Sequence, residues 1–429
     1  MTKKKKGRVK NTCLHILTRT LRCTDFFVAI AVTLLVLWSR YYPLLTCSWT
    51  TPDSNITGLL TFVHTLFFTP HELFIALTLV GIHTHTHTEI ETKVIFIADP
   101  QLEGDAKIWR KGTAGRVEVA LNDAYHRVVA GAVARLGATH AVLLGDLFSS
   151  ERVNESEFAW RVRRFAWSFA PVLRAVPTIN VTGNHDVGYG ARITAAVLRR
   201  FERVYGAASA PHAVGSHVFC AVNSQALEGA PRALVDEAWA RVDACAAAAA
   251  AARAPVVLLT HIPLHNNGPD GAPPACDRYA VRWTTARPRT IREQTHLTPA
   301  TSARLLAALR PALVFAGHDH RGCAYRVVYS DSARDPAGVR TLVPQWTVRS
   351  VMGEHRGNVQ LLAIGRRPGP DAGFDYAVSS CALGLKMVHY VWAAIALAVY
   401  LGLRLILAVS LCCFCYRRVS TKPKQMKID

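Results

Sequence analysis

The chain has 429 residues, half of them hydrophobic, and a formal net charge of +20. This length allows one large domain or two ordinary ones, with membrane segments besides. The charge suggests an anionic partner, but lysine is concentrated at the two ends and arginine in the middle, and no basic motif with interleaved aromatic residues is present. We therefore expect no nucleic-acid partner and interpret the basic ends as flanks of membrane segments.

The first predicted elements are a basic cytosolic tail over residues 1–25 and a membrane anchor over residues 26–47. The tail carries "KKKKGRVK", and the anchor begins with "FFVAIAVTLLVLW". A basic flank followed by an apolar core is typical of a signal anchor.

A linker over residues 48–92 contains a second apolar stretch, residues 56–82. The stretch is long enough to span a bilayer but carries His64, Pro70, His71 and Glu72 near its middle. A third span would force one basic tail to the wrong side of the membrane. We therefore expect a membrane-associated hairpin or an artefact of the gene model.

Residues 93–366 alternate short apolar runs with helical patterns, which predicts an α/β domain. The predicted strands are residues 93–98, 140–144, 178–181, 217–222, 255–260 and 312–316, and the clearest helices are residues 115–136 and 157–173. Later runs at 324–329, 341–348 and 358–364 are expected to add antiparallel strands. The Pro- and Gly-rich segment 266–295 interrupts this rhythm, and its five arginines could meet an anionic glycolipid or simply face solvent.

A linker over residues 367–386 leads to a second membrane span, residues 387–416, and a basic cytosolic tail, residues 417–429. Two spans would place the middle of the chain in the lumen. Six cysteines lie between the spans, an even number that permits disulfides without fixing their pairing. Glycosylation sequons begin at Asn55, Asn154 and Asn180, the last inside a predicted strand.

Polar tags follow five of the predicted strands. They are Asp99-Pro100-Gln101, Gly145-Asp146, "GNHD" at residues 183–186, His261 in "THIPLH", and "GHDH" at residues 317–320. Side chains at the carboxyl ends of neighbouring strands form one site in an α/β sheet. Oxygen and imidazole donors without thiolate select ions such as Mn²⁺, Fe²⁺ or Zn²⁺. Two such ions, roughly 3.5–4 Å apart, would polarise a phosphate ester and supply a hydroxide nucleophile.

These tags make the chain resemble the calcineurin-like metallophosphoesterase superfamily over about residues 93–364. The resemblance implies a four-layer α/β/β/α sandwich, here with flanking transmembrane helices. It also implies a first ion on Asp99 and His320, a second ion on Asn184, His261 and His318, and Asp146 bridging both. His185 would have the catalytic role of contacting the scissile phosphate, and Asp186 and Asp319 would hold neighbouring imidazoles in place.

Gln101 stands where such enzymes usually have histidine. An amide oxygen is a weaker donor than imidazole but usable for hard ions. We therefore expect an active site in which Gln101 is a weak ligand of the first ion. Of the two expected divalent ions, Mn²⁺ is favoured, with Fe²⁺, Zn²⁺ or Mg²⁺ as alternatives.

A narrower resemblance rests on "IADPQ", "GDLF", "GNHDVGYG", "VNSQAL", "THIPLH" and "VPQWTVRSVMG". The chain is similar in these stretches to a membrane-anchored branch that removes ethanolamine phosphate from mannoses of glycosylphosphatidylinositol (GPI) anchors. This resemblance implies a GPI glycolipid or GPI-anchored protein as substrate, a role in GPI-protein maturation and transport, and a multi-pass place in the endoplasmic reticulum or Golgi membrane with the catalytic domain in the lumen. The alternatives are a phosphodiesterase or phosphatase acting on another lipid or nucleotide, and a non-catalytic membrane adaptor.

Overall fold

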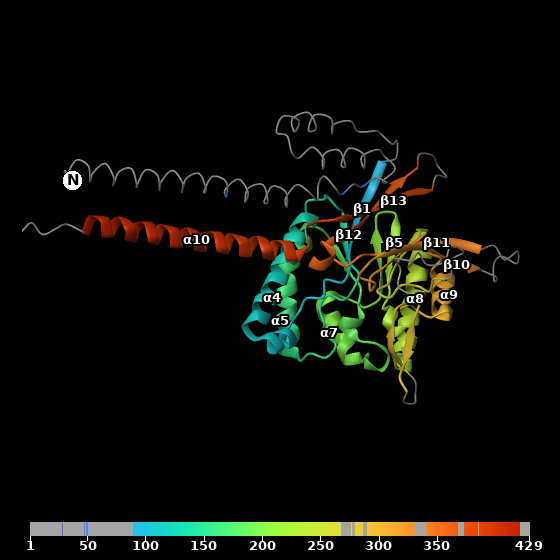
Figure 1. Ribbon diagram of the computed structural model, residues 1–429. Coiled ribbons are helices and arrows are strands. Elements are labelled where there is room, and N and C mark those ends of the chain that lie inside the picture. Colours follow the sequence, from blue (N-terminus) through green and yellow to red (C-terminus); the bar gives the residue numbers. More distant parts are fainter. Residues whose placement is uncertain are drawn as a thin grey trace, which may run out of the picture. The chain divides into compact units, whose positions relative to one another are not determined.

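The computed structural model (Figure 1) describes residues 28, 47, 49, 89–266, 276, 279–285, 290–330, 340–367, 373–384 and 386–420. It divides into two compact units, residues 43–386 and residues 1–42 with 387–429. The predicted basic tail 1–25, almost all of the N-terminal anchor, the apolar segment 56–82 and residues 421–429 lie outside the described residues.

Two mixed sheets form the larger unit. The first sheet has the strand order β13-β12-β1-β2-β3, made by β1 (Glu89–Ile97), β2 (His140–Leu143), β3 (Thr178–Asn180), β12 (Asn358–Arg366) and β13 (Phe374–Ala382). The second has the order β10-β11-β9-β6-β5-β4, made by β4 (Ala210–Val214), β5 (His217–Ala221), β6 (Val256–Leu259), β9 (Leu313–Ala316), β10 (Cys323–Ser330) and β11 (Arg340–Thr347). Strands β1, β2 and β3 run parallel, as do β5, β6 and β9.

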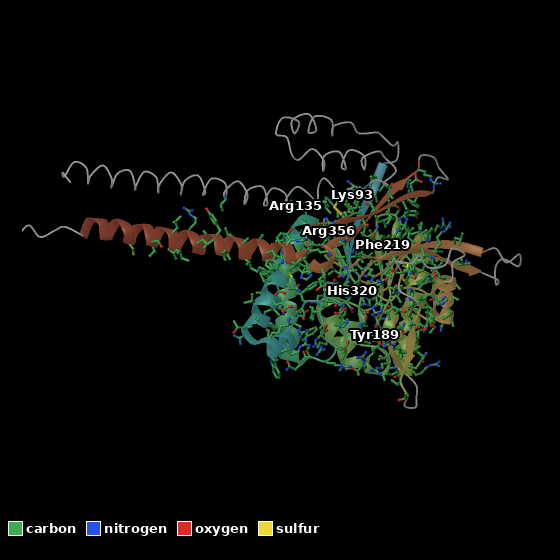
Figure 2. All side chains as sticks on the ribbon, in the orientation of Figure 1. Lys93, Arg135, Tyr189, Phe219, His320 and Arg356 are labelled. Atoms are coloured by element: carbon green, nitrogen blue, oxygen red, sulfur yellow. A yellow bond between two sulfur atoms is a disulfide. The ribbon has the colours of Figure 1, made fainter. Side chains whose placement is uncertain are left out.

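The two sheets pack face to face over an apolar core. Phe96 of β1 and Phe315 of β9 stack with their ring centroids 3.9 Å apart, and Phe219 of β5 (Figure 2) belongs to the same buried cluster. Every residue from Val94 to Ala98 is fully buried, so β1 reads as one continuous apolar run rather than an alternating one. This interior fixes the strand ends that carry the polar tags.

Helices cover the outer faces of both sheets and give four layers (Figure 1). The paired helices α4 (Asp105–Val133) and α5 (Glu155–Ala175) lie on the side of the first sheet. The helices α8 (Arg232–Ala252) and α9 (Pro299–Leu309) pack on the second sheet through Trp239, Val242 and Leu305. The remaining elements are α6 (Asn184–Val187), η1 (Gly190–Arg192), α7 (Ala195–Tyr205), η2 (Ser224–Ala226), β7 (Val281–Trp283), β8 (Ile291–Gln294), η3 (Gly353–His355) and α10 (Met387–Ser420).

All six predicted strands and both predicted helices form, but some boundaries differ. Strand β11 pairs antiparallel with β10 and parallel with β9, so it is not a purely antiparallel addition. The expected linker 367–386 contains β13, which pairs with β12 along its whole length. Its sequence, "FDYAVSSCA", lacks a strong apolar signal because β13 is a half-buried edge strand.

Three disulfides join the cysteines that lie between the outer spans. They pair Cys47 with Cys381, Cys220 with Cys245, and Cys276 with Cys323. In the other unit, Met387–Ser410 of α10 is long and apolar enough to cross a membrane and is not buried. Among the described residues it is the one candidate span. The structure therefore shows one of the expected flanking transmembrane helices, and the N-terminal one lies almost entirely outside the described residues.

Candidate metal centre

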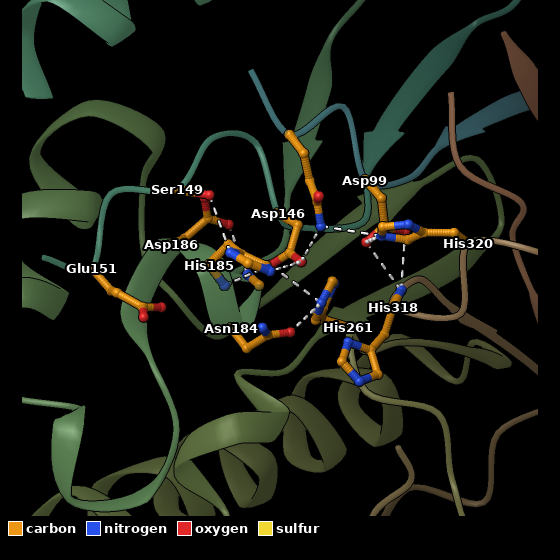
Figure 3. Close-up of polar contacts among 12 residues, drawn as sticks. Asp99, Asp146, Ser149, Glu151, Asn184, His185, Asp186, His261, His318 and His320 are labelled. Carbon is orange, nitrogen blue, oxygen red and sulfur yellow. Dashed lines mark hydrogen bonds and ion pairs between the residues drawn. The ribbon is translucent and has the colours of Figure 1, made fainter. Parts of the chain in front are cut away.

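The five polar tags meet at the carboxyl ends of β1, β2, β3, β6 and β9 (Figure 3). Asp99, Asp146 and His261 are almost completely buried there, and Asn184 is 6% exposed. Because parallel strands of both sheets end at the same edge, residues more than two hundred positions apart in the chain come into contact.

The backbone at this edge adopts conformations that residues other than glycine rarely adopt. Four tag residues have positive φ angles, namely Asp99 (51°), Gln101 (40°), Asp146 (52°) and His318 (76°). Such conformations cost energy and persist at functional sites because the surrounding fold enforces them. The tag glycines are required by space, since a Cβ on Gly183 would lie 2.1 Å from Asp146 Oδ1 and one on Gly145 would lie 2.7 Å from His261 Nδ1.

Asp146, Asn184, His261 and His318 are the residues expected around the second ion, here called the second-ion set. His261 Nε2 lies 3.0 Å from Asn184 Oδ1 and 3.3 Å from Asp146 Oδ1. The ligand atoms offered by Asp146, His261 and His318 lie within 4.8 Å of one another. The structure thus brings the predicted second-ion ligands together.

The tautomer of His261 leaves one nitrogen for a cation. Its Nδ1 lies 2.7 Å from the Leu144 carbonyl oxygen and can only donate to it, so Nε2 faces two oxygen acceptors. Burial alone would lower the pKa of His261, but the Asp146 and Asp99 carboxylates and the Leu144 carbonyl together outweigh it and raise the pKa to about 9. A proton on Nε2 and a divalent ion therefore satisfy the same pair of oxygens, and the donor set fits a metal.

His318 is held in the opposite state. Its Nε2 lies 2.9 Å from the Gln294 carbonyl oxygen and 3.3 Å from the Tyr189 hydroxyl, which leaves Nδ1 without that proton. Burial and the neighbouring His261 lower the pKa of His318 to about 3. A neutral imidazole with a fixed tautomer is the form in which histidine binds metals.

The first-ion set consists of Asp99, Gln101, Asp146 and His320. His320 Nε2 lies 3.7 Å from Asp99 Oδ1, and Gln101 Nε2 lies 3.1 Å from both His320 Nε2 and Asp146 Oδ2. The amide NH₂ of Gln101 bridges Asp146 Oδ2 and His320 Nε2, whose lone pairs could bind a cation instead. Rotation of the amide by half a turn would present its oxygen to such a cation, so Gln101 fits as a ligand as well.

His185 lies at the mouth of the site, with its side chain 42% exposed. Its backbone N–H donates to Asp146 Oδ1 at 2.8 Å, and its Nδ1 lies 3.1 Å from the Ser149 hydroxyl. Nε2 lies 3.9 Å from Asp146 Oδ2. This exposed position leaves His185 free to contact a substrate phosphate, the role that the resemblance implies for it.

Asp186 and Asp319 both accept hydrogen bonds from the backbone of the loops that carry the expected ligands. Asp186 accepts hydrogen bonds from the N–H groups of Leu147, Phe148 and Gly183 and so ties the Asp146 loop to the Asn184 loop. Burial and Asp146 raise the pKa of Asp186 to about 8. Asp319 Oδ1 accepts from the Arg321 N–H at 2.9 Å and shapes the turn that carries His318 and His320.

Several supporting groups were not predicted from the sequence. The Leu144 and Gln294 carbonyls fix the two imidazoles, and the Ser350 hydroxyl donates to the Asp99 carbonyl at 2.9 Å. Backbone carbonyls carry no residue-type signal, so these contacts could not be read from the sequence. Ser350 lies in "VPQWTVRSVMG", the one sequence signal that pointed to this region.

A cavity of about 600 Å³ opens beside the second-ion set, where a ligand could reach both the expected metal ligands and His185. It contains Asn184, His185 and His318 together with charged residues of both signs, Arg152, Arg192, Arg292, Glu151 and Glu293. Thr284 and Thr290, which flank the gap within the hairpin β7–β8, also line it. The segment 266–295 therefore contributes a wall of the pocket.

The arrangement is suited to cleaving a phosphoester. Two bound divalent ions would polarise the phosphate and lower the pKa of a water molecule. The chain's own residues position Asp146 between both sets, keep His318 neutral and direct His185 at the opening. Burial raises the pKa of Asp99, as does nearby Asp146, although His261 lowers it, so a cation beside Asp99 would be strongly favoured.

Comparison with known proteins agrees with this geometry. Residues 92–322 match the model of the family described as calcineurin-like phosphoesterase. The chain is 23% identical to Protein TED1 of Saccharomyces cerevisiae, covering 73% of this chain and 82% of TED1. It is 28% identical to metallophosphoesterase 1 of Ailuropoda melanoleuca, covering 56% and 60% of the two chains.

Among solved structures, a dimetal phosphatase from Danio rerio aligns over 67% of this chain and 99% of its own, with 13% identity and a TM-score of 0.36. The family match covers more than half of the chain and includes every tag from Asp99 to His320. The chain accordingly belongs to the calcineurin-like phosphoesterase family and is a metal-dependent phosphoester hydrolase.

Proposed function

We propose that this hydrolase removes ethanolamine phosphate from a mannose of GPI anchors, at the lumenal face of the endoplasmic reticulum or Golgi membrane. The observation that carries the proposal is the pocket beside His185, which combines arginines with Glu151 and Glu293. Ethanolamine phosphate carries a phosphodiester anion and a primary ammonium. A pocket with both signs of charge matches such a zwitterion better than it matches a purely anionic phosphate.

Glu151 is the acidic residue best placed for the ammonium. Its backbone N–H donates to the His185 carbonyl at 3.2 Å, so it lies directly beside the group expected at the phosphate. Its Oε1 is 3.2 Å from Arg192 and 3.5 Å from Arg152. A carboxylate has two oxygens, and Oε2 has no hydrogen-bond partner among the described residues, which leaves an acceptor for the substrate.

Two features favour the lumenal placement. The three disulfides suit an oxidising compartment such as the endoplasmic reticulum rather than the cytosol. Asn154, the sequon residue at the start of α5, is exposed, although its Oδ1 also accepts from the Glu157 N–H at 2.9 Å. Asn180 is half-buried in β3 and donates to the Tyr205 carbonyl, so its sequon does not count toward this placement.

In the proposed reaction the chain's residues bind and orient the ethanolamine phosphate group and protonate the leaving oxygen. Arginines of the pocket hold the phosphodiester, Glu151 takes the ammonium, and His185 Nε2 points at the phosphate, where it stabilises charge or protonates the leaving mannose oxygen. Mn²⁺ is the favoured occupant of both ion sets because the donors are oxygen and imidazole.

The test is mass spectrometry of GPI glycans from cells that lack this protein, complemented with the wild-type chain or with Asp146→Ala. We expect ethanolamine phosphate to accumulate on a mannose and to be removed only by wild type. Unchanged glycans in the deficient cells would refute the GPI substrate. Removal by Asp146→Ala would instead favour the adaptor alternative.

A further inference from the structure

Helix α4 exposes an uncharged face to solvent. Val117, Leu121 and Val128 are 53%, 44% and 51% exposed, and Ala120 and Ala124 between them are exposed as well. Their spacing puts all five on one side of the helix. The other sides of the helix, with Val119, Tyr125 and Val129, are buried in the unit. A contiguous apolar face of this kind marks an interaction site.

Helix α5 extends this face with an aromatic residue. Trp167 is 49% exposed, and the Arg127 guanidinium lies 4.7 Å from its ring centroid while donating to the Trp167 carbonyl. Trp and Arg side chains combine an apolar body with a polar end, and this is the chemistry of the membrane–water interface.

The chain leaves the catalytic unit beside α4. The N–H groups of Leu383 and Gly384 donate to the carbonyls of Gly357 and Arg356, at 3.2 and 3.1 Å. Gly357 in turn touches α4, since a Cβ on it would lie 2.7 Å from Val129 Cγ2. Residues 383–386 alone separate β13 from the candidate span that starts at Met387, and four extended residues reach only about 14 Å.

The exit also carries a small excess of positive charge. Burial, Arg349 and Lys386 lower the pKa of His355 whereas Glu354 and Asp319 raise it, so charges of both signs surround this ring, and Arg356 (Figure 2) adds a cation next to it in the chain. Basic residues next to a span attract anionic lipid head groups. The ring centroid of His355 is 5.9 Å from that of His320, so this basic side lies next to the first-ion set.

From these observations we infer that the α4 face, defined as Val117, Ala120, Leu121, Ala124, Val128 and Trp167, rests on the bilayer surface. The bilayer is the partner because the face is apolar, is next to an interfacial Trp–Arg pair, and lies beside the short tether to a candidate span. The contact would hold the ion sets close to substrates that are themselves anchored in the membrane. This inference rests on the membrane placement in the proposed function but not on the GPI substrate.

The experiment uses the full chain in nanodiscs of phosphatidylcholine with phosphatidylserine. A benzoylphenylalanine photo-crosslinker replaces Leu121 on the α4 face, and in a matched control it replaces Val204 of α7, which is also 44% exposed. We expect lipid adducts at position 121 at least about tenfold more abundant than at position 204. Equal adducts at both positions, or adducts of position 121 with this chain or a second copy, would overturn the inference.

A second measurement separates this inference from the proposed function. Leu121→Glu should lower turnover of a GPI glycolipid in vesicles several-fold. It should leave turnover of soluble bis-p-nitrophenyl phosphate unchanged, because Leu121 belongs to neither ion set and does not line the cavity beside His185. Equal rates for Leu121→Glu and wild type on both substrates would overturn the membrane contact while the GPI function stands. If wild type cleaves only the soluble ester, the GPI function fails, and the lipid adducts alone decide the inference.

Discussion

The Nε2 atom of Gln101 lies 3.1 Å from His320 Nε2 and 3.1 Å from Asp146 Oδ2, and so connects two members of the first-ion set. An amide at this position competes with a cation for the same lone pairs, because its NH₂ group satisfies them without a metal. In the neighbouring second-ion set, the group that takes the place of a cation is the proton on His261 Nε2. We therefore expect the first ion to bind more weakly than the second.

Gln101→His should strengthen binding of the first ion. An imidazole with a free nitrogen is a better ligand than a neutral amide, and the Mn²⁺ concentration for half-maximal activity should fall by about tenfold or more, on the order of the effects of changes around metal sites. Metal titration of activity after dialysis against a chelator measures this. Gln101→Ala is the control, because it removes both the bridge and the ligand and should raise the required Mn²⁺. Identical titrations for all three chains would contradict the assignment.

Asp146→Asn should abolish hydrolysis. Asp146 is 1% exposed and contacts Gln101, His261 and the His185 backbone, so it belongs to both ion sets. The amide keeps the shape but loses the charge, and we expect activity to fall by about a thousandfold or more, with less than two bound ions per chain by elemental analysis. Asp236→Asn on the exposed side of α8 is the matched control and should keep both metals and activity. A fully metallated, active Asp146→Asn chain would rule out the bridging role.

Metal affinity should rise with pH. In the metal-free protein the pKa of His261 is about 9, above its usual 6.5. Its proton therefore stabilises the metal-free fold fully below pH 6.5, and this contribution is lost as the pH rises through about 9. Because a metal must displace that proton, the apparent Kd for Mn²⁺ should fall by up to about tenfold per pH unit between pH 7 and 9. Calorimetric titrations across this range test it, and a constant Kd would show that His261 binds no metal.

The sequence predicted the catalytic centre better than its surroundings. Asp99, Asp146, His261 and His318 each follow a buried apolar strand, and such strands leave a strong periodic signal that places their ends. That placement gathers the expected ligands in one site because parallel strands end at one edge, whereas their division between two ions came from the resemblance to the superfamily. The conformational cost at Asp99 and Asp146 was not visible, since only the fold shows which residues must take positive φ.

Elements with weak burial escaped prediction for a physical reason. The edge strand β13 and the hairpin β7–β8 alternate polar and apolar residues irregularly because neither is covered on both faces. The carbonyls of Leu144 and Gln294 that orient the imidazoles are independent of the side chain present. Pairing of the six cysteines was equally open, since it depends on the distances between folded elements.

Removing the disulfide between Cys220 and Cys245 should destabilise the catalytic unit. It closes a loop of 25 residues between β5 and α8, and losing such a cross-link costs about 3 kcal/mol. The double change to alanine should therefore lower the thermal unfolding temperature of the detergent-solubilised chain by several degrees. Cys413→Ala is the control because Cys413 is free and exposed. If the double variant unfolds at the wild-type temperature, the disulfide does not form in the isolated protein.

Glu151→Gln should weaken recognition of a substrate amine. We would compare two p-nitrophenyl phosphodiesters, one carrying ethanolamine and one carrying a propyl group of the same length without the charge. Burial raises the pKa of Glu151 although Arg192 lowers it, so a further cation beside the carboxylate is favoured. A hydrogen bond to a charged group is worth about 1.5–3 kcal/mol, so the kcat/KM preference of wild type for the amine should fall about tenfold or more.

The matched control for this comparison is Glu155→Gln, the same change four residues further along. Glu155 is 70% exposed and pairs with Arg203 at 3.3 Å, outside the pocket, so its substitution should leave the amine preference intact. Glu151→Asp keeps the charge but shortens the side chain, and it should retain part of the preference. If wild type shows no preference for the amine, the pocket does not select ethanolamine. If wild type prefers it and Glu151→Gln does as well, the ammonium is bound elsewhere, and Glu293 is the next residue of the pocket to change.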